Sequence, residues 1–286
     1  MDWTVFAQQT WNGLVNGTGY ALFALGLTLI FGVLNVINLS HGEFFMLGAM
    51  VAVFLQKLLG INFFVALVPA ALLGGALGFI CNRVAVRPLV RASPLSTILS
   101  TLALSYILVN ISLTLWPYPV TLKVPFKGVI NLGGVHITEA SLVSFALGGI
   151  AVAILYLFLT KMRKGKEIGA TAQNMVGASL VGIDVKGIFD LTFVIAAALA
   201  AVGGVLVAPL WQAYSTMGQA ILLKGFAIVV VGGMGNVMGC VGVALLVGIG
   251  EALFGNYVSM YFKEAALFVV MIIVLLIRPQ GIFAEK

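Results

Sequence analysis

The sequence predicts an all-α integral membrane protein: a polytopic helical bundle in one domain that covers residues 1–286. Two observations lead to this class. Apolar residues make up 62% of the chain and charged residues 8%, whereas an ordinary soluble domain has about 45–50% and about 25%. The mean hydropathy is +1.16. A soluble fold of this size could not cover so much apolar surface, which excludes secreted, nucleic-acid-binding and disordered proteins.

Long apolar runs define the predicted membrane spans, because a helix needs about 20 apolar residues to cross a bilayer. A shorter run, 44–58, follows a polar break, and the run 226–253 is interrupted at 232–236 by three glycines. The last run, 257–277, carries Lys263 and Glu264 near one end, where both can reach the interface. The run 226–253 either crosses the membrane once or forms a helical hairpin with its tip at 232–236, and we favour the hairpin because three glycines suit a helix centre poorly. We predict eight long spans, or nine segments if both hairpin arms are counted. The uninterrupted runs are 13–36, 61–81, 95–115, 140–159 and 191–210.

Two basic loops set the predicted orientation. Arg83, Arg87 and Arg91 lie in one loop, and residues 160–187 form a second basic loop two spans later. Basic residues concentrate in cytoplasmic loops of membrane proteins, so both loops are expected in the cytoplasm and the N-terminus outside. The net charge of +6 follows from this rule and does not indicate a nucleic-acid partner.

A polar stretch at residues 35–43 separates two apolar runs with almost no room for a loop. Its polar groups need partners, because lipid offers none. One interpretation is a broken helix that lines a solute path. The other is a tight interfacial turn, in which Ser40 and Glu43 form a capping box at the start of the next helix. The candidate path residues are Asn38, Ser40, His41, Gly42 and Glu43.

The basic loop 160–187 contains small residues at multiples of four. This spacing puts Ala170, Ala178 and Gly182 on one face of a short helix, which would suit close docking into a groove of another protein. The alternative is a solvated loop with a single helical turn.

Other features favour structural roles. Gly203, Gly204 and the glycines of 232–242 are typical of close packing between membrane helices. Lys224 and Glu251 lie near span ends, where we expect them at the membrane interface; the alternative is that they line a path. The sequence contains no phosphate-binding loop and no Cys/His cluster. We therefore expect no ATP site, no metal site, no cofactor and no catalysis in this chain.

Several segments closely resemble the branched-chain amino acid ABC transporter permease family, in particular the H-type member of its permease pair. The most specific is Val36-Ile37-Asn38-Leu39-Ser40-His41-Gly42-Glu43, preceded by the similar stretch 19–33. The resemblance covers essentially the whole chain. It continues at 172–183, 200–206, 224–226, 231–236 and 278–283.

This resemblance implies a permease subunit of an ATP-driven importer for branched-chain and related hydrophobic amino acids in the bacterial inner membrane. The implied partners are the lipid bilayer, a second permease, two cytoplasmic ATPases that bind the ATP, and a periplasmic substrate-binding protein. The loop 160–187 would dock into an ATPase. The residues expected to couple are Lys166, Ala170, Asn174, Ala178 and Gly182.

The sequence departs from the family pattern at one position of this loop. The family usually has Arg where this sequence has Gly169, so docking here could use Lys166 instead.

Three alternative functions remain. Some relatives import urea or short amides. A secondary transporter would want carboxylates within the membrane, and the chain offers little beyond Glu43. A scaffold subunit without a path of its own is a third class.

Overall fold

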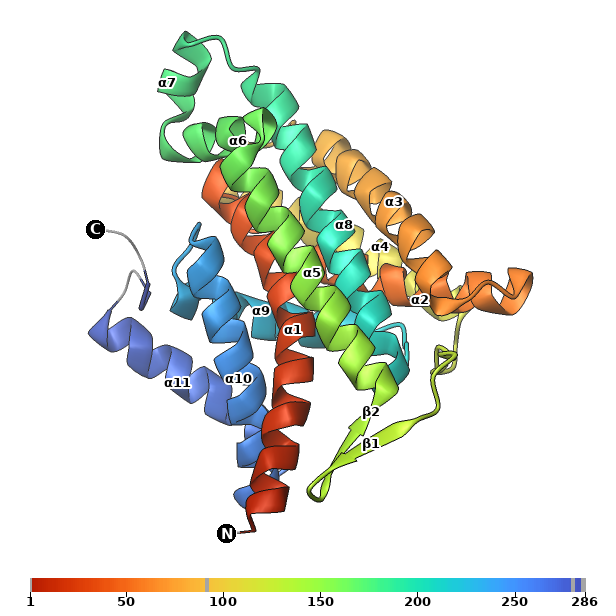
Figure 1. Ribbon diagram of the computed structural model, residues 1–286. Coiled ribbons are helices and arrows are strands. Elements are labelled where there is room, and N and C mark those ends of the chain that lie inside the picture. Colours follow the sequence, from red (N-terminus) through yellow and green to blue (C-terminus); the bar gives the residue numbers. More distant parts are fainter. Residues whose placement is uncertain (1, 91–92, 279–280, 284–286) are drawn as a thin grey trace.

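The computed structural model describes residues 2–90, 93–278 and 281–283, and its helices form one bundle (Figure 1). Arg91, Lys286 and residues 279–280 of the similar C-terminal stretch lie outside the described residues. The strands are β1 (Val129–Leu132) and β2 (Val135–Thr138). The helices are α1 (Trp3–Leu34), α2 (His41–Leu59), α3 (Phe63–Cys81) with the π-helical turn η1 (Asn82–Val86), α4 (Pro94–Leu115), α5 (Glu139–Lys161), α6 (Arg163–Gln173), α7 (Met175–Leu180), α8 (Val185–Trp211), α9 (Met217–Gly232), α10 (Val237–Tyr257) and α11 (Lys263–Ile277).

The membrane class and the approximate number of spans are confirmed. In the part of the chain that the structure describes, seven helices are long and apolar enough to cross a membrane: α1, α2, α3 with η1, α4, α5, α8 and α10. Two further helices are shorter, α9 with 16 residues and α11 with 15. Counting these two gives nine helical segments, in line with the expected eight to nine.

The two ends of the bundle differ in the segments that they carry. The N-terminus and the β1–β2 hairpin lie at one end, and α6 and α7 lie at the other (Figure 1). Arg83 and Arg87 belong to the end with α7, because their side chains line one groove with it. The two basic loops therefore share an end, as the predicted orientation requires. We name this the inner end and the opposite one the outer end.

Helix α1 lies at the centre of the bundle, and glycines bring α10 into close contact with it. A Cβ added to Gly17 would lie 2.9 Å from the carbonyl oxygen of Ala244, and one added to Gly13 would lie 2.5 Å from the Cα of Ile249. Side chains larger than hydrogen at these positions would force the two helices apart. Of the glycines predicted to serve helix packing, Gly204 does so, because an added Cβ would meet the carbonyl oxygen of Phe45 on α2, whereas one on Gly242 would meet no atom within 4 Å.

The glycine-rich break at 232–236 is the tip of a helical hairpin, as predicted. Gly233 and Gly235 have φ values of +94° and +87°, which residues with a side chain rarely adopt. The N–H of Gly235 donates to Thr28 Oγ1 on α1 at 2.9 Å. Asn236 Oδ1 accepts from the Gly239 N–H at 2.8 Å and so caps α10. Helix α9 thus leads to the tip, and α10 returns along α1.

Candidate functional site

The polar stretch 35–43 turns back into the bundle instead of forming a loop at its inner end. Helix α1 ends at Leu34, and Asn35 follows in the left-handed conformation with φ +53°. His41, the first residue of α2, places its Nε2 3.3 Å from the carbonyl oxygen of Phe23. Phe23 lies about three helical turns before the end of α1. Helix α2 therefore begins in the interior, which agrees with the broken-helix interpretation.

Of the two interpretations of this stretch, the capping box is not formed. Ser40 is the residue before α2, but its hydroxyl donates to Asn38 Oδ1 at 2.7 Å and makes no cap hydrogen bond. The Ser40 N–H also donates to Asn38 Oδ1, at 3.0 Å. Glu43 instead accepts a hydrogen bond from Ser105 Oγ on α4 at 2.8 Å. Because the side chain of Asn38 occupies the N–H of Ser40, Glu43 is available to contact another helix.

The first turns of α2 and α9 meet at this stretch. A Cβ on Gly218 of α9 would lie 2.6 Å from the carbonyl oxygen of Gly42 and 2.7 Å from Glu43 Oε2. The N-terminal turn of a helix has unpaired N–H groups and a positive partial charge. The carboxylate of Glu43 thus lies where two such ends converge. This geometry requires glycine on both sides of the contact.

Hydroxyl groups of α4 complete the surroundings of the helix break. Thr101 Oγ1 accepts from the Leu39 N–H at 3.2 Å, and Ser105 contacts Glu43 as described. Further along α4, Ser112 Oγ donates to Ser215 Oγ at 3.0 Å, in the turn before α9. We did not predict these residues from the sequence. The sequence does show hydroxyl residues at four-residue spacing here, and the structure buries all three of them: Thr97, Thr101 and Ser105.

The five candidate path residues lie together and are buried, with Asn38, Ser40, His41 and Glu43 at 0% exposure. Among the described residues, three of their side-chain atoms have no hydrogen-bond partner: Asn38 Nδ2, His41 Nδ1 and Glu43 Oε2. An unpartnered buried polar group costs about 1–3 kcal/mol in proteins. The arrangement offers both donor and acceptor groups to water or to a polar solute.

The loop 160–187 forms two short helices, so the prediction of one helical face is wrong. Lys166 and the exposed Ala170 belong to α6, whereas Ala178 belongs to α7. Asn174 separates them, because its Oδ1 accepts from the Gly177 N–H at 2.8 Å and caps α7. Gly182 lies in the turn after α7 with φ +86°. These residues share one loop but not one surface.

The exposed surface of α7 is apolar. Ala178 is only 5% exposed, so it packs against its own chain and not outward. Val176, Leu180 and Val181 are 70%, 83% and 77% exposed. These larger side chains, and not the small residues that the spacing singled out, are the ones that α7 presents to a neighbour.

A groove of about 1200 Å³ at the inner end lies between α7, the start of α8 and the basic segment after α3. Asp190 of α8 holds that segment in place. It accepts from Arg83 Nη2 at 2.7 Å and from Asn82 Nδ2 at 2.7 Å, and Arg87 Nη1 lies 3.5 Å from the same carboxylate. The two basic loops that the sequence marked as cytoplasmic therefore line one surface.

Charged side chains of α6 pair with one another at the surface. Glu167 accepts from Lys164 Nζ at 2.8 Å and from Arg163 Nε at 3.1 Å. Lys164, and to a lesser extent Arg163, hold the pKa of the Glu167 carboxyl below its usual value. Lys166 is exposed on the same helix.

Lys224 and Glu251 lie inside the bundle, as the alternative of a path-lining role requires. Lys224 Nζ donates to Glu251 Oε1 at 2.8 Å, and the two side chains are only 11% and 9% exposed. The Tyr20 hydroxyl donates to Glu251 Oε2 at 2.7 Å. Lys224 lies in the middle of the 16-residue helix α9 and not near its end. In the described ranges, no group of three His, Cys, Asp or Glu residues could hold a metal ion.

Residues 9–277 match the protein family described as branched-chain amino acid transport system / permease component. The chain belongs to this family. This permease is 34% identical to the high-affinity branched-chain amino acid transport system permease protein LivH of Salmonella typhimurium, over 98% of this chain and 96% of that protein. It is 23% identical to LivM of Escherichia coli, over 92% of this chain and 67% of that protein.

Among solved structures, the permease is similar to PsaBC from Streptococcus pneumoniae in complex with Fab. The TM-score is 0.47 at 13% identity, over 91% of this chain and 89% of that one. Family membership and the apolar helices establish a multi-pass protein of the inner membrane. The resemblance that the sequence suggested is confirmed.

Proposed function

We propose that this permease moves branched-chain and related hydrophobic amino acids across the inner membrane, as one of two permeases in an ATP-driven importer. Two cytoplasmic ATPases supply the energy, and a periplasmic binding protein delivers the solute. The name and the near-complete coverage of LivH support this substrate class. The greater identity to LivH than to LivM, 34% against 23%, supports a role as the LivH-like member of the pair.

The observation that carries the proposal is the helix break inside the bundle. Transporter helices that are interrupted within the membrane use their N-terminal ends and freed backbone groups to bind solutes. Here the N-terminal ends of α2 and α9 meet beside Asn38, His41 and Glu43, each of which has an unpartnered polar atom in the described structure. Ser40 orients Asn38, and Gly42 allows the close approach of α9.

These residues are fully buried, so a solute reaches them only when a neighbouring helix moves. Helix α4 is the best candidate for the moving side. It contacts the break through the hydroxyls of Thr101 and Ser105 and meets the turn before α9 through Ser112. Hydrogen bonds of this kind contribute about 1 kcal/mol each. A conformational cycle driven by ATP can readily break and re-form them.

The ATPase contact is proposed for the groove at the inner end. Its apolar side is α7, with Val176 and Leu180, and its basic side is Arg83 and Arg87. Lys166 on α6 extends the basic surface. ATP is bound by the partners and not by this chain, which contains no phosphate-binding loop. The purified lone subunit should therefore show no ATP hydrolysis.

Uptake of labelled leucine, alanine and urea by cells that carry or lack this chain with its partners tests the substrate. Leucine uptake that depends on the chain supports the proposal, whereas uptake of urea alone would assign the permease to urea or amide import. Glu43→Gln and His41→Ala test the path, with Glu139→Gln as a control outside it. If both path variants transport normally at wild-type expression, the helix break has a structural role only.

A further inference from the structure

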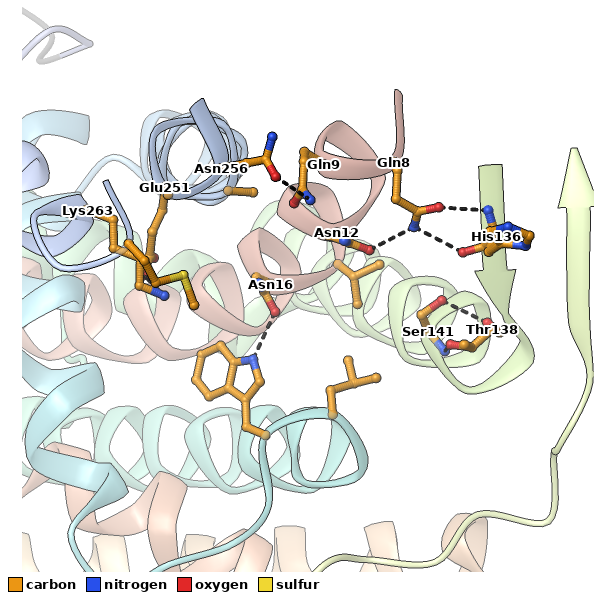
Figure 2. A pocket seen from close by; sticks show the side chains of 16 residues that line it. Gln8, Gln9, Asn12, Asn16, His136, Thr138, Ser141, Glu251, Asn256 and Lys263 are labelled. Atoms are coloured by element: carbon orange, nitrogen blue, oxygen red, sulfur yellow. Dashed lines mark hydrogen bonds and ion pairs between the residues drawn. The ribbon is translucent and has the colours of Figure 1, made fainter. Parts of the chain in front are cut away.

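Four polar side chains lie on one face of the outer half of α1. They follow one another at intervals of four residues, so they form a row about 18 Å long. Polar side chains in a membrane-spanning helix are costly unless they face the bundle interior or a water-filled cavity. Figure 2 shows three of them at the edge of a cavity of about 560 Å³. This polar stripe consists of Gln8, Asn12, Asn16 and Tyr20.

A second cavity, of about 330 Å³, adjoins the first at the inner end of the polar stripe. Asn16, Trp211 and Glu251 line both cavities, so the two are neighbours along α1. Their volumes lie within the range of small-molecule sites, about 300–1,000 Å³. The polar stripe thus leads from the outer end to a cavity of ligand size in the middle of α1.

The second cavity is bordered by a charge cluster from three helices. Lys224 Nζ lies 2.8 Å from Glu251 Oε1 and 3.1 Å from Glu264 Oε1, and Lys263 Nζ lies 3.4 Å from Glu251 Oε1. The side chains of Lys224 and Glu251 are only 11% and 9% exposed, whereas those of Lys263 and Glu264 are 29% and 58% exposed. Removing the inner pair from water costs about as much as its attraction returns, so packing alone does not account for that pair. The charge cluster consists of Lys224, Glu251, Lys263 and Glu264, two ammonium and two carboxylate groups.

Apolar and aromatic side chains stand beside the charge cluster. The rings of Tyr20 and Trp211 lie 5.6 Å apart between centroids, and Trp211 Nε1 donates to Asn16 Oδ1 at 2.9 Å. Met217 and Ile221 line the same cavity. One cavity therefore combines charges of both signs with a hydrophobic surface, and its surroundings carry no excess charge.

We propose that this cavity receives an amino acid in its zwitterionic form, on the outer side of the helix break. The α-carboxylate binds to Lys224 and Lys263, the α-ammonium binds to Glu251 and Glu264, and the side chain packs against Trp211. This inference rests on the proposed function, because that function makes the solute an amino acid. It adds a recognition site that an uncharged solute such as urea could not use.

The position of the cavity suits a step before passage through the break. Tyr20 lies one helical turn before Phe23 on α1, and the Phe23 ring packs on His41 with centroids 4.9 Å apart. On the neighbouring α9, Gly225 faces Phe23 and follows Lys224 directly. Phe23 therefore lies between the charge cluster and His41, one of the candidate path residues.

The test pairs each charged residue with the ligand group that it binds. Labelled leucine binding is measured on the complete complex of both permeases and ATPases in lipid nanodiscs, without the binding protein. N-acetyl-leucine, which lacks the ammonium, and leucinamide, which lacks the carboxylate, are measured by competition. We expect Glu251→Gln to weaken leucine binding about tenfold or more and leave N-acetyl-leucine unchanged. Lys224→Met should weaken leucine similarly and leave leucinamide unchanged.

Two further variants guard against a purely structural effect. The double variant Lys224→Met with Glu251→Gln leaves neither partner of the buried pair as an unpaired charge, so it should assemble even if a single variant does not. Glu139→Gln, which alters an outer-end carboxylate that accepts from the Gly128 N–H, should bind all three compounds normally. Wild-type leucine affinity in the double variant would overturn the inference. So would equal weakening of all three compounds, or no binding by the wild-type complex.

Cellular uptake separates this inference from the proposed function. If cells take up leucine through the wild-type importer but the cavity variants behave as wild type, only the cavity assignment fails. If the wild-type importer takes up urea and no leucine, the proposed function fails first and the zwitterion site fails with it.

Discussion

Gly42 on α2 and Gly218 on α9 touch backbone to backbone, although 176 residues separate them in the sequence. A Cβ on Gly218 would lie 2.6 Å from the carbonyl oxygen of Gly42. The contact joins the starts of two helices inside the bundle and places the carboxylate of Glu43 between them. Because glycine has no Cβ, these two residues allow α9 to lie directly against the helix break.

Gly218→Ala should displace α9 and impair uptake strongly, because overpacking of this kind typically costs about 1–3 kcal/mol. The matched control is Gly250→Ala on α10, where an added Cβ meets no atom within 4 Å. Both variants are assayed for uptake and for thermal unfolding in detergent. Normal uptake by Gly218→Ala would mean that α9 has room to shift without consequence.

Ser105→Ala should destabilise the protein, because Glu43 then loses the hydrogen bond to its carboxylate in a fully buried setting. We expect a loss of about 1–3 kcal/mol in the free energy of unfolding. Thr114→Ala is the control on the same helix, since Thr114 is exposed and bonds only to the carbonyl of Asn110. Equal unfolding temperatures for the two variants would contradict the importance of the Ser105–Glu43 contact.

Leu180→Glu should reduce co-purification of the ATPases, since Leu180 is 83% exposed on α7 and a buried unpaired charge at an interface costs several kcal/mol. Leu180→Met keeps the residue apolar and should retain the complex. Ala178→Glu would act differently, because Ala178 packs within the loop and the variant should disturb the loop itself. Full ATPase recovery with Leu180→Glu would exclude α7 from the contact.

Lys166→Ala should weaken ATPase association. Gly169→Arg should be tolerated and should restore that association in the Lys166→Ala background. A Cβ at Gly169 meets no atom within 4 Å, and Arg is the residue that the family usually has at this position. Arg is also a better helix former than Gly by about 1 kcal/mol. The measurement is ATPase co-purification from the single and double variants. No recovery in the double variant would show that Lys166 and position 169 do not substitute for each other.

The membrane spans and both helix breaks could be predicted from the sequence. A helix needs about 20 apolar residues to cross the lipid, and polar groups that interrupt such a run need partners that lipid does not offer. The start of α1 was harder to place. The apolar run predicts a span from residue 13, whereas the helix begins at Trp3. Gln8 and Asn12 look unsuited to a membrane helix in sequence, yet they face a cavity and not lipid. The β1–β2 hairpin was missed too, although Gly133-Gly134 between two short apolar stretches is a recognisable turn.

The clustering of the candidate site residues was predictable where they are neighbours in the chain and not where the fold brings them together. Asn38 to Glu43 form one segment, so their clustering was visible. Lys224 and Glu251 come from different helices, and no spacing rule relates them. The prediction of one continuous helical face in the loop 160–187 failed for a local reason. Asn174 caps α7 and Gly182 adopts a left-handed conformation, so the helices end where periodicity alone would continue them.

The central position of α1 has a consequence for how the chain is made. Helix α1 emerges first from the ribosome, yet 89% of its apolar window is buried, and the helices that cover it, α5, α8, α9 and α10, are all synthesised later. Until α8 and α10 are made, Asn16 and Tyr20 of the polar stripe lack their partners Trp211 and Glu251, whereas the stretch at 35–40 already has Thr101 of α4 as a neighbour. Helix α1, the first to be synthesised, therefore becomes buried only after α8 and α10 have been inserted beside it.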